Sequence, residues 1–97
     1  MNMPVVRRGV RLVNSQGLHL RPADMFVRLA NTFSSEIKIT KENQTVDGKS
    51  ILGIVMLAAE YGSHLELEAT GDDAESAVNA LIGLIEQGFA EGQLNSD

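Results

Sequence analysis

The stretch EIKITKENQTVD, residues 36–47, alternates apolar and polar side chains on both sides of a turn and decides the architecture of the chain. Ile37 and Ile39 fall on one side of a predicted strand over 36–41, and polar side chains fall on the other. Glu42 and Asn43 suit a tight turn, after which Gln44–Asp47 returns as a short second strand of a hairpin. Because such strands bury only one face, this pattern predicts a sheet that needs cover on one side.

Two further strands extend this pattern. Val10–Val13 is a predicted strand with Val10 and Leu12 on one face. His64–Thr70 alternates over its whole length, and its apolar side chains are Leu65, Leu67 and Ala69.

Helical periodicity predicts three helices that can cover the apolar face of this sheet. Apolar side chains recur at helical spacing over residues 20–32, with Phe33 continuing the stripe, and a short apolar helix runs from Ile51 to about Ala59. Asp72 and Glu75 have the spacing of a capping box before a last helix. The core stripe of that helix is Val78, Leu81, Ile82, Ile85 and Phe89. The expected helix ends are Tyr61-Gly62-Ser63 for the second helix and Gly88 or Gly92 for the third.

The order β-α-β-β-α-β-α predicts an α+β open-faced β-sandwich, a four-stranded, mostly antiparallel sheet covered on one face by three helices. Its 97 residues fit a single domain over 1–97, with a core at about 9–89 and peripheral segments at 1–8 and 90–97. Aromatic residues make up only 4% of a chain that is 43% hydrophobic, so we expect an aliphatic core.

Composition excludes several function classes. The formal net charge of −5 argues against nonspecific nucleic-acid binding, although five arginines lie in the first third of the chain. The absence of cysteine excludes disulfides and zinc–thiolate sites. Apolar runs fall short of the about 20 residues that span a bilayer, and residues 1–8 lack the apolar segment of a signal peptide. We therefore expect a cytoplasmic protein without membrane insertion.

The segment GLHLRPA, residues 17–23, indicates the chemistry. Proline is tolerated in the first turn of a helix, where its missing N–H has no partner. The remaining amides, those of Leu20 and Arg21, carry the positive end of the helix dipole and favour an anion. Arg21 adds a forked cation suited to phosphate, and His19 adds a nucleophilic imidazole. The segment predicts a histidine that carries a phosphoryl group transiently, against the alternative that His19 caps the helix or lies on a loop without any chemical role.

A second motif, GKSI at residues 48–51, superficially resembles a phosphate-binding loop. That pattern requires another glycine five positions before Gly48, where Asn43 stands, so nucleotide binding is rejected. Ser50 is instead predicted to cap the short helix. A phosphate on a capping serine is tolerated at the positive end of a helix, so Ser50 is also a candidate modification site.

The short helix is apolar nearly all round and cannot bury every side chain on one sheet face. We expect some of Leu52, Val55 and Met56 to remain exposed as a docking patch. His64 lacks companions at metal-ligand spacing and is interpreted as structural or superficial. No metal and no cofactor are expected.

Together, the segments at 17–23 and 49–53 resemble the histidine-containing phosphocarrier (HPr) family of the bacterial phosphotransferase system, over about residues 9–89. The resemblance implies a monomeric carrier, not an enzyme with turnover. Its His19 accepts phosphate on Nδ1 from phosphorylated enzyme I and passes it to an enzyme IIA. It also implies that Arg21 stabilises the phosphate and that an HPr kinase/phosphorylase modifies Ser50. Leu20, Leu52, Val55 and Met56 are the implied docking residues.

The alternative within this resemblance is a mainly regulatory protein, in nitrogen-branch or catabolite-control signalling, that acts by binding partners such as a transcriptional regulator. A small acid–base or metal enzyme is a weaker third hypothesis, because no convergent carboxylates or ligands are evident. Two departures from the family concern its branch: Leu20 stands where alanine is common, and residues 57–62 lack the usual pattern. The transported sugar and the particular IIA partner are not determined by the sequence.

Overall fold

The computed structural model describes residues 3–90. The elements in chain order are β1 (Val5–Arg11), α1 (Leu20–Ala30), β2 (Glu36–Lys41), β3 (Gln44–Asp47), α2 (Ile51–Met56), β4 (His64–Thr70), α3 (Ala74–Glu86) and a final 3-10 turn, η1 (Gly88–Ala90). The predicted β-α-β-β-α-β-α order and the predicted fold class are confirmed.

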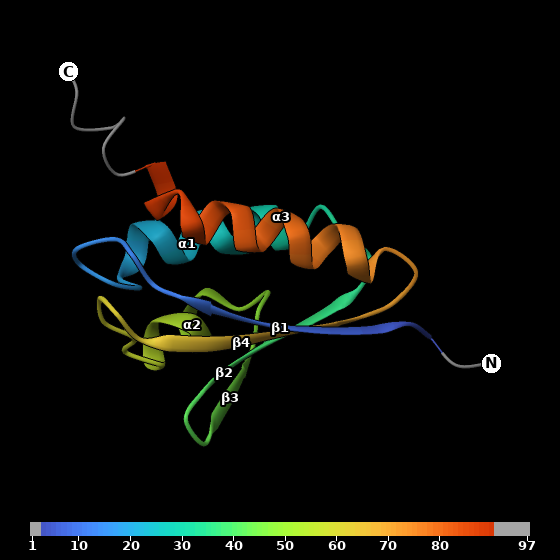
Figure 1. Ribbon diagram of the computed structural model, residues 1–97, viewed down its shortest axis with the longest axis horizontal. Helices are drawn as coiled ribbons and strands as arrows, with labels where there is room; N and C mark the ends of the chain where they lie inside the picture. The colour runs from blue at the N-terminus through green and yellow to red at the C-terminus, as the bar shows by residue number, and fades with distance from the viewer. Residues whose placement is uncertain (1–2, 91–97) are drawn as a thin grey trace.

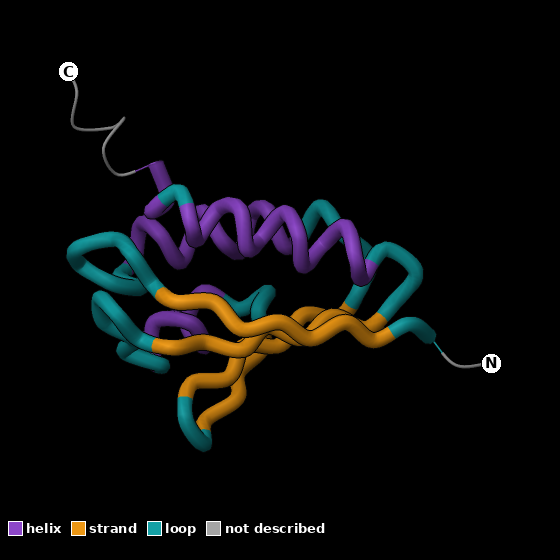
Figure 2. The backbone as a smooth tube through the Cα atoms, in the orientation of Figure 1, coloured by secondary structure: helices purple, strands orange, loops and turns teal. Residues whose placement is uncertain are grey.

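The sheet has the strand order β1-β4-β2-β3, and each of its three pairings is antiparallel (Figures 1 and 2). Strand β4 is central, pairing Leu65 with Val10 of β1 and Leu67 with Ile39 of β2. The alternation therefore aligns across strands, and one apolar face forms from segments far apart in sequence. Each fully buried leucine or isoleucine on it contributes roughly 1.5–3 kcal/mol.

Helices α1 and α3 lie side by side over this apolar face (Figure 1). Helix α2 is shorter, lies toward one end of the sheet and contacts α1 and β3. The core is aliphatic, as predicted, apart from the fully buried Phe26 and Phe89. No helix within residues 3–90 is long and apolar enough to cross a bilayer.

The prediction for the first strand was wrong in its bounds. Strand β1 begins at Val5 and ends at Arg11, because all seven of its residues pair with β4. Arg8 gains contacts from α3, where Asn79 Oδ1 accepts from its guanidinium at 2.6 Å and Glu75 Oε2 at 3.2 Å. Leu12 is buried as predicted, but it lies beyond the strand, with its N–H bonded to the Ser63 carbonyl at 3.0 Å.

Three helix boundaries also differ from the prediction. Helix α1 ends at Ala30, two residues early, and α2 ends at Met56 because Ala58 takes a left-handed φ of 51°. The capping box is absent: Asp73 occupies the N-cap of α3, and its carboxylate accepts from Ser34 and Ser35 instead. The predicted end at Gly88 is confirmed, with a φ of 64°. Gly92 and residues 93–97 lie outside the described residues.

Candidate functional site

His19 occupies the N-cap of α1 in an extended conformation, with φ −82° and ψ −168°. Its carbonyl accepts the N–H of Ala23 at 3.1 Å, but its imidazole makes no capping hydrogen bond. The residue is exposed. The backbone of His19 therefore starts the helix, whereas its side chain is not engaged in the cap and faces solvent. This excludes the alternative in which the ring serves as the cap.

Three residues, Asn14, Gly17 and Leu18, fix the conformation of the loop before His19. The Leu18 side chain is buried, and its N–H donates to the Ala59 carbonyl at 2.9 Å. Asn14, also buried, donates from Nδ2 to the Gly17 carbonyl at 2.7 Å. Gly17 has a φ of +72°, and a Cβ there would collide with the Ala59 backbone. The position of the imidazole thus depends on contacts on both sides of Gly17.

The first turn of α1 leaves backbone donors beside the imidazole. With His19 as N-cap, the amides of Leu20 and Arg21 precede the first intrahelical bond, and Pro22 has no N–H to offer. These are the two backbone groups predicted to bind phosphate. The positive end of the helix dipole adds roughly 0.3–1 kcal/mol for an exposed anion.

Arg21 is exposed and extends along α1, where its guanidinium donates to the sulfur of Met25 at 3.3 Å. Thioether sulfur is a weak acceptor, so an arriving anion replaces this contact at little cost. Asp24, which the sequence prediction did not include in the site, pairs with Arg28 at 2.9 Å. That pairing partly offsets a negative charge close to His19.

His19, Leu20, Arg21 and Asp24 line an open depression of about 510 Å³ together with Ile51. Ile51 is the first residue of α2, so the structure brings the two sequence motifs together. Ser50 caps α2 as predicted, with its Oγ accepting the Gly53 N–H at 3.0 Å.

An apolar patch adjoins the depression. Leu20, Leu52 and Met56 are 66%, 69% and 63% exposed, whereas Ile51 is half-buried. Val55 was predicted to share this exposure, but it is half-buried and packs against the core. We define the apolar patch as Leu20, Leu52 and Met56, a surface assembled from α1 and α2.

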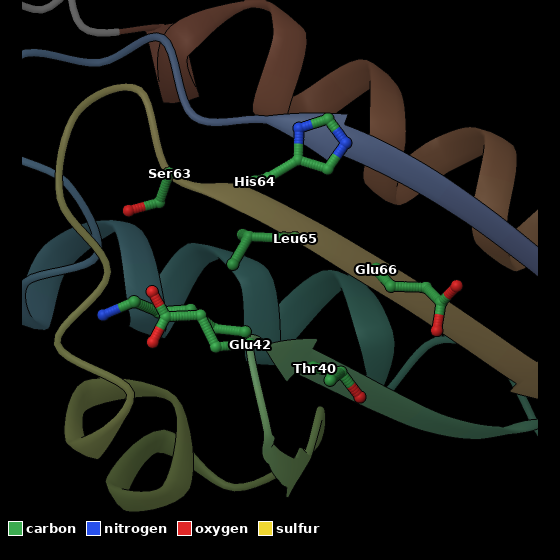
Figure 3. A pocket seen from close by; sticks show the side chains of 7 residues that line it. Thr40, Glu42, Ser63, His64, Leu65 and Glu66 are labelled. Carbon is green, nitrogen blue, oxygen red and sulfur yellow. The ribbon is translucent and has the colours of Figure 1, made fainter.

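A second depression of about 420 Å³ lies where β2 ends and β4 begins, and it includes no residue of the first (Figure 3). His64 lines it, and its ring points toward β1 and away from Glu42 (Figure 3). His64 is exposed, which agrees with its interpretation as a surface residue. Within residues 3–90, no three His, Asp or Glu side chains cluster as metal ligands do.

The fold and the site define a class: small open-faced β-sandwich proteins that present a histidine at a helix N-terminus beside an apolar patch. Comparison with known proteins narrows this class. The family described as "PTS HPr component phosphorylation site" matches residues 6–87. The chain belongs to this family, the HPr phosphocarriers of the phosphotransferase system.

Individual members of this family are similar to the chain over most of its length. The phosphocarrier protein HPr of Neisseria meningitidis is 40% identical over 92% of this chain and all of that protein. The phosphocarrier protein NPr of Proteus mirabilis is 39% identical over 87% of this chain and 94% of that one. The crystal structure of HPr-C-His from Thermoanaerobacter tengcongensis superposes with a TM-score of 0.86 at 44% identity, covering 89% of this chain and 97% of that one.

Proposed function

We propose that His19 is the residue that accepts and donates the phosphoryl group. The observation that carries this proposal is the exposed imidazole at the N-cap of α1, which makes no capping bond and lies beside two unpaired backbone amides. If His19 served only to cap the helix, a ring nitrogen would accept a hydrogen bond from one of those amides.

The transfer is a displacement at phosphorus. The neutral imidazole attacks the phosphorus through Nδ1, and the new N–P bond forms as the bond between the phosphorus and the donor atom of the phosphorylated partner breaks. The donor atom leaves with the bonding electron pair, and the phosphorylated ring of His19 keeps its proton on Nε2, so no oxidant or reductant is required. The amides of Leu20 and Arg21 and the guanidinium of Arg21 then face the added charge, which they stabilise modestly. Modest stabilisation suits a carrier, which must also release the group.

The proposed donor is phosphorylated enzyme I, and the proposed acceptor is an enzyme IIA. Each must bring its own reacting group to the same nitrogen of His19, so both have to dock on the surface around His19. Leu20 of the apolar patch lines the same depression as His19, so the patch fits this purpose, whereas half-buried Val55 packs against the core. Because each chain holds one phosphoryl group at a time and must give it up before it can accept another, it acts as a stoichiometric carrier within a relay. We propose that it does so as a cytoplasmic monomer.

A second, regulatory role has its own observation. Ser50 Oγ lies at the N-terminus of α2 and accepts the Gly53 N–H, so a phosphate there would sit at the positive end of the patch-bearing helix. Modification by an HPr kinase/phosphorylase would then change the docking surface directly. A mainly regulatory protein, in nitrogen or catabolite signalling, remains the alternative function.

Incubation with phosphoenolpyruvate and enzyme I tests the carrier proposal. The expected product is an acid-labile, base-stable phosphate that His19→Ala abolishes. Equal labelling of His19→Ala would refute the assignment. ATP and the kinase test the second site separately, and labelling that persists in Ser50→Ala would remove Ser50 from the proposal.

A further inference from the structure

The C-terminal end of α2 is held by a side chain from the sheet. Lys41 is the last residue of β2 and shares the helix-facing side of that strand with Ile37 and Ile39. Its half-buried side chain reaches α2, where Nζ donates to the Leu57 carbonyl at 3.2 Å and the Ala58 carbonyl at 3.4 Å.

Helix α2 needs support of this kind. It has six residues, fewer than two turns, and helices this short are unstable without tertiary contacts. Its last amides fold back tightly, from Leu57 to the Ile54 carbonyl at 3.2 Å and from Ala58 to the Val55 carbonyl at 3.0 Å. The left-handed φ of Ala58 then turns the chain away. The next carbonyls receive no helical N–H, and the ammonium of Lys41 supplies both a donor and a favourable charge.

The two ends of α2 are thus fixed by different parts of the chain. Ser50 caps the beginning, Lys41 holds the end, and between them Ile54 anchors the helix in the core. Leu52 and Met56, one helical turn apart, are the exposed residues that α2 contributes to the apolar patch. Because both stand on one short helix, the orientation of α2 decides where they lie relative to His19.

We propose that Lys41 is a positioning residue for partner docking: it sets the end of α2 and thereby the apolar patch, without contact with the phosphoryl site. Lys41 does not line the depression at His19, and its donors are directed to the far end of α2. This inference rests on the proposed function and deepens it, because it assigns a docking role to a residue outside the patch.

The test compares four proteins as substrates of enzyme I. Lys41→Met keeps most of the aliphatic stem but loses the ammonium, and Lys41→Arg keeps the charge. Lys38→Met is the matched control, since Lys38 is exposed on the opposite face of the same strand. For Lys41→Met we expect the KM of enzyme I to rise about three- to tenfold, with kcat changed less than about twofold. Lys41→Arg should restore most of the wild-type KM, and Lys38→Met should match wild type.

Two further measurements separate positioning from general damage. The rate at which isolated phosphohistidine hydrolyses should be the same in Lys41→Met and wild type, because no hydrogen bond of Lys41 reaches His19, Leu20 or Arg21, and the bonds that hold the loop before His19 do not involve Lys41. Amide exchange at Leu57 and Ala58 should accelerate in Lys41→Met, while exchange in α1 is unchanged. A wild-type KM in Lys41→Met, or an equal rise in Lys38→Met, would overturn the proposal.

If Lys41→Met fails to fold, Lys41→Gln takes its place, since it loses the charge and its side chain, one atom shorter than that of lysine, leaves its N–H donors short of the Leu57 and Ala58 carbonyls. A folded Lys41→Gln with wild-type KM would also overturn the docking role. Failure of the wild-type protein to accept phosphate from enzyme I would instead refute the proposed function. In that case, amide exchange at Leu57 and Ala58 would still show whether Lys41 holds the end of α2.

Discussion

Replacing Gly17 with alanine tests how the loop before His19 is built. The φ of +72° lies in the left-handed region, which costs a residue with a Cβ about 1–2 kcal/mol. The added methyl group would also overlap the backbone of Ala59 and Glu60, which cannot move aside as a flexible side chain can. Overpacking of this kind adds about 1–3 kcal/mol. The sum, about 2–5 kcal/mol, is a large part of the free energy of unfolding of a whole domain, which is typically about 5–15 kcal/mol.

Urea denaturation measures this loss against two other glycines. With a slope of about 1.5 kcal/mol per molar urea, Gly17→Ala should lower the midpoint by about 1–3 M. Gly62→Ala, at a φ of +86° but with no atom within 4 Å of the new Cβ, should cost only the backbone strain of about 1–2 kcal/mol. Gly83→Ala, in the interior of α3 with open space around it, should stabilise by about 0.5–1 kcal/mol.

The ranking of the three variants is the critical result. If Gly17→Ala costs no more than Gly62→Ala, close packing against Ala59 does not determine the loop, and the account of how His19 is positioned fails. If it costs more, as expected, phosphoryl transfer should also slow in the folded fraction, because the imidazole lies two residues from the displaced backbone.

Three other variants give separate checks. Ser50→Ala removes the cap on the Gly53 N–H and should destabilise by about 1 kcal/mol in thermal melting, whereas Ser50→Asp should retain most of the stability; equal losses would contradict the capping role. Hydrogen bonds, first that of the Ser35 hydroxyl, hold the pKa of Asp73 below its model-compound value of 3.8. Their stabilisation is therefore present above about pH 4 and is lost as the pH falls through the lowered pKa. In acid titrations followed by circular dichroism, the stability of Asp73→Asn should therefore fall less steeply below about pH 4 than that of wild type. Leu52→Ser should leave stability within about 0.5 kcal/mol yet slow transfer from enzyme I in initial-rate assays; unchanged transfer would remove Leu52 from the docking patch.

Local sequence patterns predicted the elements that alternate or repeat cleanly. The hairpin over 36–47 and the strand at His64–Thr70 were predicted within their observed bounds, because alternation is a property of neighbouring residues. The start of β1 was not predicted, since Arg7 and Arg8 interrupt its apolar pattern. Pairing with β4 extends that strand, and pairing depends on a segment more than fifty residues away.

In the candidate site too, some residues could be predicted from local sequence patterns and others could not. Its chemical groups, among them His19, Arg21 and the cap at Ser50, were identifiable from two short motifs. The residues that position those groups were not. Asn14 holds the loop and Lys41 holds the end of α2, yet each stands in an unremarkable local context. Their roles arise from contacts across the fold.

The sequence by itself thus determined the fold class and predicted the chemistry that we propose at His19, because secondary-structure periodicity and a helix N-terminus are encoded within a few consecutive residues. Only the tertiary structure decided that Ile51 lies beside His19, that Leu20 of α1 and Leu52 and Met56 of α2 stay exposed on two helices in contact, and that α2 ends at Met56. The physical reason is that these features are juxtapositions, which come from the burial of a shared core and the pairing of distant strands.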